Sequence, residues 1–399
     1  MEVQIEDIML ALIRKVVCDR EISATVENAI IPEVFPQLYV LSKSHDMAHI
    51  VAHGLSELDL LGEDDISQKF QKQKMLALYR YQKMSYELER ICHVLENAKI
   101  PFIPLKGAVI RQYYLQPWMR TSCDIDVLVH EIHLKSAIDA LTDQLHYKNG
   151  GQSSHDVSLF SKSGVHVELH YDLIEKIRYP TAVKLLSKVW IYAEPQSGFM
   201  YHHRLKEEMF YFYHTVHMAK HFENGGCGVR MVVDQWILDH CVSCNIDNRN
   251  SLILEGNLKQ FNDLAKALAD VWFSNERGNE LTKAMSAYII TGGIYGNREN
   301  SVAVKRSKEG RFWRYVMSRL FLPYDTLSRQ YPILQRKKWL LPFMQVCRWF
   351  RLFRKESMKR TVRELKTNRN MSKEKILSTT DLLRNLGLNE NANSLDKKC

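Results

Sequence analysis

Two aspartates interrupt an apolar segment in the middle of the chain, at 120-RTSCDIDVLV-129. Alternate residues of a β-strand point to the same face of a sheet, so Asp124 and Asp126 would project together. Two neighbouring carboxylates repel each other and raise each other's pKa unless a cation neutralises them. This strand therefore either lies at a sheet edge with its acids in water or contributes to a divalent-metal site.

Two flanking motifs favour the metal site. Upstream, 105-LKGAVI-110 places Gly107 at a turn from a strand into a helix, where the backbone can approach a phosphate and free amides favour an anion. Downstream, Glu168 lies in 165-VHVELHYDL-173, the second strand of a predicted hairpin. If that hairpin pairs beside the strand of the two aspartates, Glu168 supplies a third carboxylate. Three carboxylates and a phosphate turn indicate two-metal phosphoryl or nucleotidyl transfer.

The order L-K-G, a short helix, R-x-x-x-D-I-D-x-L-V and later V-E-L-H resembles a poorly characterised nucleotidyltransferase family of the polymerase-β-like superfamily. The resemblance covers roughly residues 98–240. It implies that Asp124, Asp126 and Glu168 are the catalytic metal ligands and that Gly107 is the phosphate-turn glycine. It also implies an NTP as substrate and Mg²⁺ as cofactor, with two ions bound and Mn²⁺ as a substitute.

One position departs from the family's pattern. Many polymerase-β-like enzymes have Ser or Gly after the turn glycine, whereas here Ala108 follows Gly107. A hydroxyl that would contact a phosphate is therefore absent, while backbone N–H donors remain. The departure bears on turnover more than on nucleotide binding.

Charged side chains near these motifs are candidates for contacts with the nucleotide. Lys106 either pairs with a triphosphate or is an ordinary surface charge. Arg120 has the same alternatives and a third one, an ion pair with Asp124. His170 shares the face of Glu168, so it either orients a substrate or has a structural role.

A later helical region, 217-HMAKHFENGGCGVRMVVDQW-236, resembles a segment that follows the catalytic core in such proteins. We predict that it forms a polar wall of the nucleotide cleft, in which Asp234 orients an arginine. The alternatives are ordinary helix packing and a histidine metal site, since three histidines recur at offsets of three and four. The wall residues are His217, Lys220, His221 and Arg230, and the three histidines are His214, His217 and His221.

The positive charge of the chain is concentrated near its C-terminus. Residues 311–369 contain 16 Lys/Arg and 3 Asp/Glu, so their net charge of +13 exceeds the +9 of the whole chain. This segment either binds an anionic partner (nucleic acid, an acidic membrane surface or an acidic protein) or forms a solvated helical face. Its aromatic residues include Trp313, Tyr315, Trp339, Trp349, Phe350 and Phe353.

The hydrophobic patterns predict an α+β protein in which helical regions flank a small mixed sheet, the polymerase-β-like core. We expect Ser67 to cap a long helix that ends near residue 98, and a polar loop over residues 148–156. The predicted segments are an N-terminal helical domain (1–98), the nucleotidyltransferase core (99–195), a C-terminal helical domain (196–300), a basic aromatic-rich helical segment (301–370) and a mobile tail (371–399).

The N-terminus and the hydropathy of the chain predict a cytoplasmic protein without a transmembrane segment. The first residues carry acids ahead of a short apolar run, unlike a secretion signal, and no run of about 18 uncharged apolar residues occurs. The 8 cysteines are interpreted as free thiols. Cys241 and Cys244 form a C-x-x-C, but the second ligand pair of a structural zinc site does not follow.

Two functions remain open from the sequence. In the first, the chain transfers NMP from an NTP to a hydroxyl acceptor and releases pyrophosphate, and the acceptor is a small molecule, a sugar, an RNA or a protein. In the second, a catalytically weak or inactive protein of this fold binds nucleic acid, a membrane surface or another protein through residues 311–369.

Overall fold

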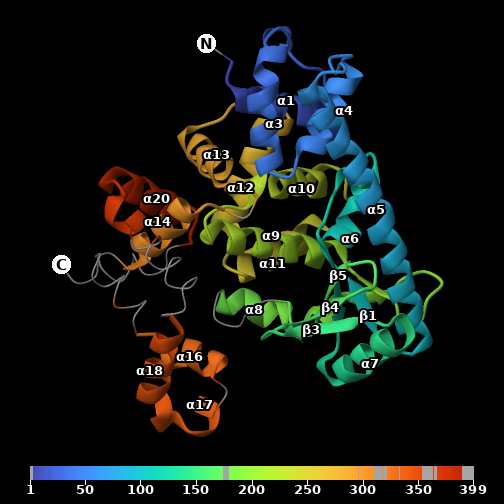
Figure 1. Cartoon of the computed structure of the whole chain (residues 1–399), viewed down its shortest axis with the longest axis vertical. Coiled ribbons are helices and arrows are strands. Elements are labelled where there is room, and N and C mark those ends of the chain that lie inside the picture. The colour runs from blue at the N-terminus through green and yellow to red at the C-terminus, as the bar shows by residue number, and fades with distance from the viewer. Residues whose placement is uncertain are drawn as a thin grey trace. The chain divides into compact units, whose positions relative to one another are not determined.

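The computed structural model describes residues 3–173, 179–294, 296–309, 317, 321–331, 333–352, 363 and 366–388. The chain divides into two compact units, Met1–Lys220 with Gly228–Ser286, and His221–Cys227 with Ala287–Cys399. The first unit contains a mixed five-stranded sheet flanked by helices, which confirms the predicted α+β fold (Figure 1). None of the helices within the described ranges has the length and hydrophobicity needed to cross a membrane.

Helices occupy most of the first 97 residues, as predicted. The longest is α5, which Asp64 caps by accepting hydrogen bonds from the amides of Ile66 and Ser67 at 3.0 and 3.1 Å. The prediction of Ser67 as the cap is wrong, because Ser67 lies inside the first turn and donates its hydroxyl to Asp64. The helices are α1 (Ile5–Cys18), α2 (Ala24–Glu27), α3 (Phe35–Ser44), α4 (Ala48–Glu57) and α5 (Asp65–Asn97), with a 3-10 turn at Pro32–Val34.

The sheet has the strand order β1-β2-β5-β4-β3. The strand of the two aspartates, β2, pairs antiparallel with β1 and parallel with β5, and β4 joins β5 as the predicted hairpin. The hairpin therefore lies beside the aspartates, as required for Glu168 to join them. The strands are β1 (Phe102–Pro104), β2 (Asp124–Val129), β3 (Lys148–Gln152), β4 (Asp156–Phe160) and β5 (His166–His170).

Short helical segments connect these strands. A turn follows β1 and contains α6, and the longer helix α7 follows β2. They are α6 (Gly107–Ile110), α7 (Leu134–Leu145) and 3-10 turns at Arg111–Tyr113, Pro117–Met119 and Glu131–His133.

The prediction of a loop over residues 148–156 is wrong for most of its length. Lys148–Gln152 form the edge strand β3, which pairs with β4 across an irregularity between Asn149 and Gly151. All five residues of β3 are exposed. A strand that buries neither face lacks the alternating hydrophobic pattern by which strands are recognised in a sequence.

One face of the sheet packs against helices and is apolar. Ile125 and Val127 of β2 and Val167 of β5 are buried in one cluster with residues of α5 and α7, and these two helices lie against the sheet in Figure 1. Since side chains alternate along a strand, Asp124, Asp126 and their neighbours on β5 project from the opposite face. The two helices therefore hold the strands while leaving the polar face to a site.

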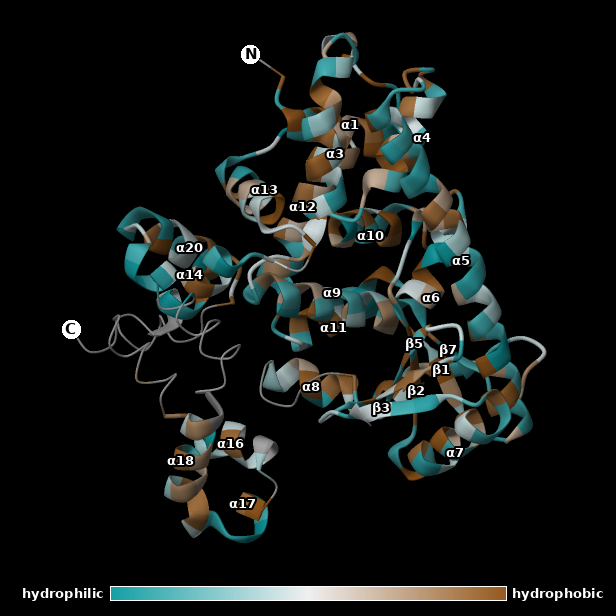
Figure 2. Cartoon of the chain, in the orientation of Figure 1, coloured by the Kyte–Doolittle hydropathy of each residue, from teal (hydrophilic) through white to brown (hydrophobic). Residues whose placement is uncertain are grey.

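The rest of the first unit is mostly helical. The helix α10 is buried from Gly228 to Leu238 except at Arg230, and its ribbon is coloured hydrophobic along much of its length (Figure 2). Residues 224–227 separate α9 from α10. The elements are α8 (Pro180–Leu186), a 3-10 turn (Val189–Tyr192), β6 (Ala193–Pro195), β7 (His203–Leu205), α9 (Glu207–Glu223), α10 (Gly228–His240), α11 (Ile246–Glu255), α12 (Lys259–Phe273) and α13 (Glu280–Gly292).

The described part of the second unit is helical. The prediction of a mobile tail over residues 371–399 is wrong for about half of that range. Residues 373–385 of the expected mobile tail form α20, which Ser372 caps through the amide of Lys375 and which packs against α14. Residues 389–399 lie outside the described residues, as do 310–316, 318–320 and 353–362 of the basic segment. The helices are α14 (Arg298–Glu309), α16 (Tyr324–Gln330), α17 (Ile333–Arg336), α18 (Leu341–Leu352) and α20 (Lys373–Asn385), with a 3-10 turn at Lys338–Leu340.

Candidate active site

The parallel pairing of β2 and β5 brings the three predicted carboxylates onto one face. Asp124 lies opposite His166 and Asp126 lies opposite Glu168 in the register of the two strands. Residues directly opposite each other in a parallel pair point the same way, so all four side chains share the polar face. Asp126 is only 3% exposed, while Asp124 and Glu168 are partly exposed.

Asp126 is the centre of a hydrogen-bond network. Its Oδ1 accepts from Lys106 Nζ at 2.6 Å and contacts His170 Nε2 at 2.8 Å, and the same His170 nitrogen lies 3.4 Å from Glu168 Oε2. Burial alone would raise the pKa of Asp126, but Lys106 and His170 outweigh burial and hold this pKa well below its usual range. The carboxylate is therefore charged, and Lys106 is its counter-ion.

Asp124 has the opposite electrostatic environment. Burial raises its pKa, and the charges of Asp126 and Glu168 raise it further, against the opposing effect of Lys106. One ammonium group thus faces three carboxylates on this part of the sheet. A divalent cation would relieve the excess of negative charge.

The side chains form two overlapping groups that could hold metal ions. One consists of Asp124, His166 and Glu168, and the other of Asp126, Glu168 and His170. Within each group the potential ligand atoms lie within 4.8 Å of one another. Glu168 belongs to both groups, so its carboxylate could serve either of them.

The turn after β1 holds Lys106 in an unusual backbone conformation. Lys106 has φ 47° and ψ −120°, a region that L-residues rarely adopt and that often marks a functional site. The next residue must be small, because a Cβ on Gly107 would lie 3.0 Å from Ser122 Cβ. The amides of Ala108 and Val109 donate to the carbonyls of Leu105 and Lys106 at 3.2 and 3.1 Å, so these two donors are already used within the turn. Close packing thus explains the glycine, and phosphate binding by Gly107 stays a prediction.

Arg120 is engaged by α10. Its Nε lies 2.8 and 2.9 Å from the two carboxylate oxygens of Asp234, which also accepts a hydrogen bond from the Tyr114 hydroxyl at 2.6 Å. The predicted pairing of Arg120 with Asp124 is not observed. Arg120 instead anchors the segment that leads into β2.

The prediction that Asp234 orients Arg230 is wrong. Arg230 Nη1 contacts Asp46 Oδ2 and the carbonyl of Thr121, both at 3.2 Å. Asp234 is occupied by Arg120, whose side chain is 9% exposed. Arg230 is nevertheless close to β2, because Thr121 precedes Asp124 by three residues.

The histidines of α9 lie in different environments. His214 is buried, and burial lowers its pKa, whereas His217 and Lys220 are partly exposed. The His217 ring is 6.1 Å from the ring of Tyr213, which is buried in the field of Lys106 and the carboxylates. His221 belongs to the second unit.

Two residues of this site were not predicted from the sequence. His166 joins Asp124 and Glu168, and its position two residues before Glu168 is a signal that could have found it. Tyr213 is 2% exposed, and its hydroxyl forms no hydrogen bond with the residues the structure describes. Burial raises the pKa of Tyr213, so the hydroxyl is protonated and available as a donor. Tyr213 carries no sequence signal, because it reaches the strands from a distant helix.

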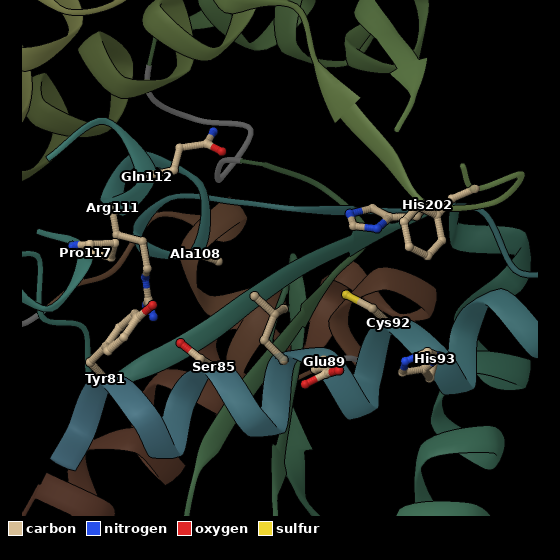
Figure 3. Close-up of a pocket in the computed structure, with 12 residues that line it drawn as sticks. Tyr81, Ser85, Glu89, Cys92, His93, Ala108, Arg111, Gln112, Pro117 and His202 are labelled. Atoms are coloured by element: carbon tan, nitrogen blue, oxygen red, sulfur yellow. The ribbon is translucent and has the colours of Figure 1, made fainter. Parts of the chain in front are cut away.

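A separate pocket of about 410 Å³ borders the turn that contains α6. Ala108 and Arg111 line it on one side and α5 lines it on the other (Figure 3). Arg111 Nε donates to the carbonyl of Gly107 at 2.7 Å, and burial lowers the pKa of Arg111 to about 10. The three carboxylates are not among the lining residues, so this pocket is distinct from the carboxylate site.

The chain matches the model of a known protein family over more than half of its length. The model of a family described as "uncharacterised nucleotidyltransferase" matches residues 33–274, which include all five strands of the sheet and the helices α9 to α12. No curated protein and no solved structure matches the chain significantly.

Proposed function

The chain belongs to the uncharacterised nucleotidyltransferase family, as its motifs predicted, and on this basis we propose that it transfers NMP from an NTP to a hydroxyl acceptor and releases pyrophosphate. The observation that carries the proposal is the pair of potential metal-binding groups that share Glu168. Two cations at adjacent positions are suited to in-line displacement, in which both the attacking and the leaving oxygen need stabilisation.

The carboxylates Asp124, Asp126 and Glu168 are the proposed ligands of two Mg²⁺ ions, for which Mn²⁺ could substitute. When bound, such ions neutralise charge on the phosphate oxygens and favour deprotonation of the acceptor hydroxyl. Mg²⁺ prefers oxygen ligands, so the three carboxylates fit it better than the adjacent imidazoles do. His170 orients Asp126 through its hydrogen bond, and His166 borders Asp124.

Lys106 has two roles in this proposal. Without substrate it neutralises Asp126, which keeps that carboxylate charged while its surroundings are buried. If a metal ion were bound beside Asp126, the ammonium group would be free to bind a phosphate oxygen of the NTP.

A polar wall beside β2 is proposed to bind the nucleotide. It consists of His217 and Lys220 of α9, with Tyr213 on the same helix next to His217, and of Arg230 near the segment leading into β2. For Arg120, whose guanidinium is held by Asp234, we propose a positioning role. For His221, nucleotide contact stays a prediction.

Calorimetric titration of the four NTPs into the full chain tests the proposal. Wild type should bind at least one NTP in the presence of Mg²⁺ or Mn²⁺ and lose this binding in EDTA. Asp126→Asn should weaken the metal-dependent binding by more than about 100-fold, since even partners of metal ligands are worth 10–100-fold. Release of pyrophosphate with a pool of hydroxyl acceptors should be lost in the same variant.

Asp139→Asn is the matched control, because Asp139 is an exposed carboxylate of α7 that pairs with Lys135. It should bind NTP and release pyrophosphate as wild type does. NTP binding that is insensitive to EDTA, or unchanged in Asp126→Asn, would contradict the assignment.

A second candidate function, binding to an anionic membrane surface, is favoured by an exposed apolar stripe that begins in the 3-10 turn Lys338–Leu340 and continues along α18. Trp339, Phe343, Val346 and Phe350 recur at intervals of four, three and four residues and are 75%, 60%, 40% and 73% exposed. This spacing places them along one side of a helix. Four basic residues accompany them within residues 336–348, with no acid in that range. An apolar stripe flanked by basic side chains is typical of helices that lie in a membrane interface.

Co-sedimentation with phosphatidylserine vesicles tests this second candidate. Wild type should bind these vesicles, bind neutral phosphatidylcholine vesicles weakly, and dissociate as the salt concentration rises. Phe343→Ser/Phe350→Ser should abolish binding, while Leu377→Ser, which changes an exposed apolar residue of α20, should not. Binding to single-stranded RNA without binding to vesicles would reject the membrane in favour of nucleic acid.

A further inference from the structure

We propose that His155, Asp156 and His170 form an additional site for a transition-metal ion, with Zn²⁺ as the preferred cation, on the polar face of the sheet. Asp156 of β4 lies opposite His170 of β5 in the strand register, so the two side chains are neighbours on this face. His155 immediately precedes β4. The potential ligand atoms of the three residues lie within 4.8 Å of one another.

The two ring nitrogens of His170 have different partners, and this difference points to a ligand. Nε2 lies 2.8 Å from Asp126 Oδ1, whereas Nδ1 is buried and has no hydrogen-bond partner among the described residues. The whole residue is 2% exposed. Buried polar atoms without a partner are uncommon in native proteins, and a bound ion is one of the groups that satisfy such atoms.

The Asp126–His170 pair has the arrangement that metal-binding histidines require. A ligating histidine generally donates its other ring N–H to a carboxylate, which fixes the tautomer and the direction of the ring. Here Nε2 can donate to Asp126 while Nδ1 presents its lone pair. A metal at Nδ1 would therefore leave the Nε2 hydrogen bond to the proposed catalytic carboxylate intact.

The other two ligands are held by the chain around them. The His155 Nε2 and Asp156 Oδ2 atoms are 3.1 Å apart, and the rings of His155 and His170 are 5.8 Å apart. Ser153 donates its hydroxyl to Asp156 Oδ2 at 2.8 Å, and the amide of Tyr171 donates to the carbonyl of His155 at 3.0 Å. The side chains of His155 and Asp156 are 16% and 12% exposed, so an ion can enter from solvent.

The donor set selects the class of metal. Two imidazoles and one carboxylate suit Zn²⁺ and its analogue Co²⁺ better than Mg²⁺, which prefers oxygen ligands. Three protein ligands also leave a coordination position for water, as in open zinc sites. The polar face would thus hold a nitrogen-rich site beside the carboxylate-rich groups of Asp124 and Glu168, and the two would differ in the cations they prefer.

Titration of the metal-stripped full chain with Co²⁺ and Zn²⁺ tests the site by spectroscopy and calorimetry. Wild type should bind Co²⁺ with visible absorption typical of tetrahedral nitrogen and oxygen ligation, and Zn²⁺, but not excess Mg²⁺, should displace it. His155→Ala should weaken binding by more than about 100-fold, the upper range for loss of a metal ligand's partner. Asp156→Asn should also weaken it, and this variant serves if His155→Ala does not fold.

The matched control is His166→Ala, which removes a histidine from the same face but from the group of Asp124 and Glu168. It should keep Co²⁺ binding. Retained affinity in both His155→Ala and Asp156→Asn would overturn the proposal. Loss of binding in His166→Ala alone, or a thiolate-to-cobalt absorption band removed by Cys244→Ser, would also overturn it by placing the ion elsewhere. These readouts measure binding only, so their outcome is independent of NTP transfer.

Discussion

Two buried aspartates of the first unit, Asp234 and Asp126, each contact a cationic side chain, but their surroundings differ. Asp234 is 1% exposed and accepts hydrogen bonds from Arg120 and from the Tyr114 hydroxyl. Asp126 is 3% exposed and accepts from Lys106, but two more carboxylates, Asp124 and Glu168, share its face of the sheet. One aspartate is paired with one guanidinium, whereas the other belongs to a group with more carboxylates than cations.

The difference separates a structural ion pair from a site that can bind a ligand. Arg120 and Asp234 join the segment before β2 to α10, and together they carry no net charge. The carboxylates of β2 and β5 keep a negative charge that an added cation can neutralise. A buried Asp–cation contact is therefore not evidence of function by itself, and the charge that remains unbalanced around it is the more informative quantity.

The largest expected effect concerns the structural pair. Asp234→Ala should lower the free energy of unfolding by about 3–5 kcal/mol, because it leaves the Arg120 guanidinium buried without its counter-ion. Urea unfolding of wild type and variant measures the change. Arg120→Met/Asp234→Leu should recover most of the loss, since apolar residues of similar size can replace a buried pair. A change below about 1 kcal/mol for Asp234→Ala would contradict the comparison.

The contribution of Asp234 should also depend on pH. Burial raises its pKa, but Arg120 outweighs burial and holds the pKa below its usual value. A carboxyl whose pKa is lowered by folding stabilises the native state above the unfolded-state pKa of about 3.9 and loses this contribution as the pH falls through the folded-state pKa. The stability difference between wild type and Asp234→Ala should therefore be constant near pH 7 and shrink in acid. A stability difference that grows in acid would contradict this pairing, because it would mean that folding raises the pKa of Asp234 instead of lowering it.

Added metal should stabilise the protein through the carboxylates of β2 and β5, and not through the Arg120–Asp234 pair. Mg²⁺ or Mn²⁺ at about 100 times its dissociation constant should raise the unfolding free energy by about 2.7 kcal/mol, because the ion binds the native state. Thermal unfolding with the ion and with EDTA measures this. Glu168→Gln should lose the effect, since Glu168 belongs to both metal-binding groups. Equal stabilisation of wild type and Glu168→Gln would place the ion elsewhere.

Neutralising Asp124 should stabilise the protein, whereas removing the carboxylate of Asp234 should destabilise it. In EDTA, Asp124→Asn should raise the unfolding free energy by roughly 0.5–2 kcal/mol, the range typical of a single stabilising substitution. The reason is that the substitution removes repulsion from Asp126 and Glu168. Unfolding in urea without metal measures the gain, and Asp139→Asn on the exposed face of α7 should show none. Destabilisation by Asp124→Asn would mean that its carboxylate is already neutralised.

Elements with buried residues could be predicted from the sequence, because burial leaves a pattern of apolar residues along the chain. The strand Asp124–Val129 is mostly apolar, and the hairpin of β4 and β5 alternates between apolar and polar residues, so they and the face of Glu168 could be placed in advance. The edge strand β3 could not, because all its residues are exposed and nothing in them alternates by burial. The helix α20 was missed for a related reason, since few of its residues are buried.

The site was predictable only where its residues lie close together in the chain. The i, i+2 spacing places Asp124 with Asp126 and Glu168 with His170 without knowledge of the fold. The partner of Arg120 lies on α10, and nothing in the local sequence distinguishes Asp234 from other acids. Tyr213 likewise reaches the strands through the packing of α9, so only the folded chain identifies it.

The smallest expected effect compares the tyrosines of the two regions. Tyr213→Phe should not lower the unfolding free energy, because its buried hydroxyl has no partner among the described residues and removing it breaks no hydrogen bond. Tyr114→Phe should cost about 1.5–3 kcal/mol, since it deletes a hydrogen bond to the charged Asp234. Urea unfolding of both variants measures these changes, and NTP titration adds the functional contrast. Tyr213→Phe should weaken NTP binding while Tyr114→Phe leaves it intact, because the Tyr213 hydroxyl interacts electrostatically with the carboxylates and Lys106, whereas the Tyr114 hydroxyl is bonded to Asp234. If Tyr213→Phe instead destabilised the protein as much as Tyr114→Phe does, its hydroxyl would already have a structural partner, and the difference between the two regions would not extend to their tyrosines.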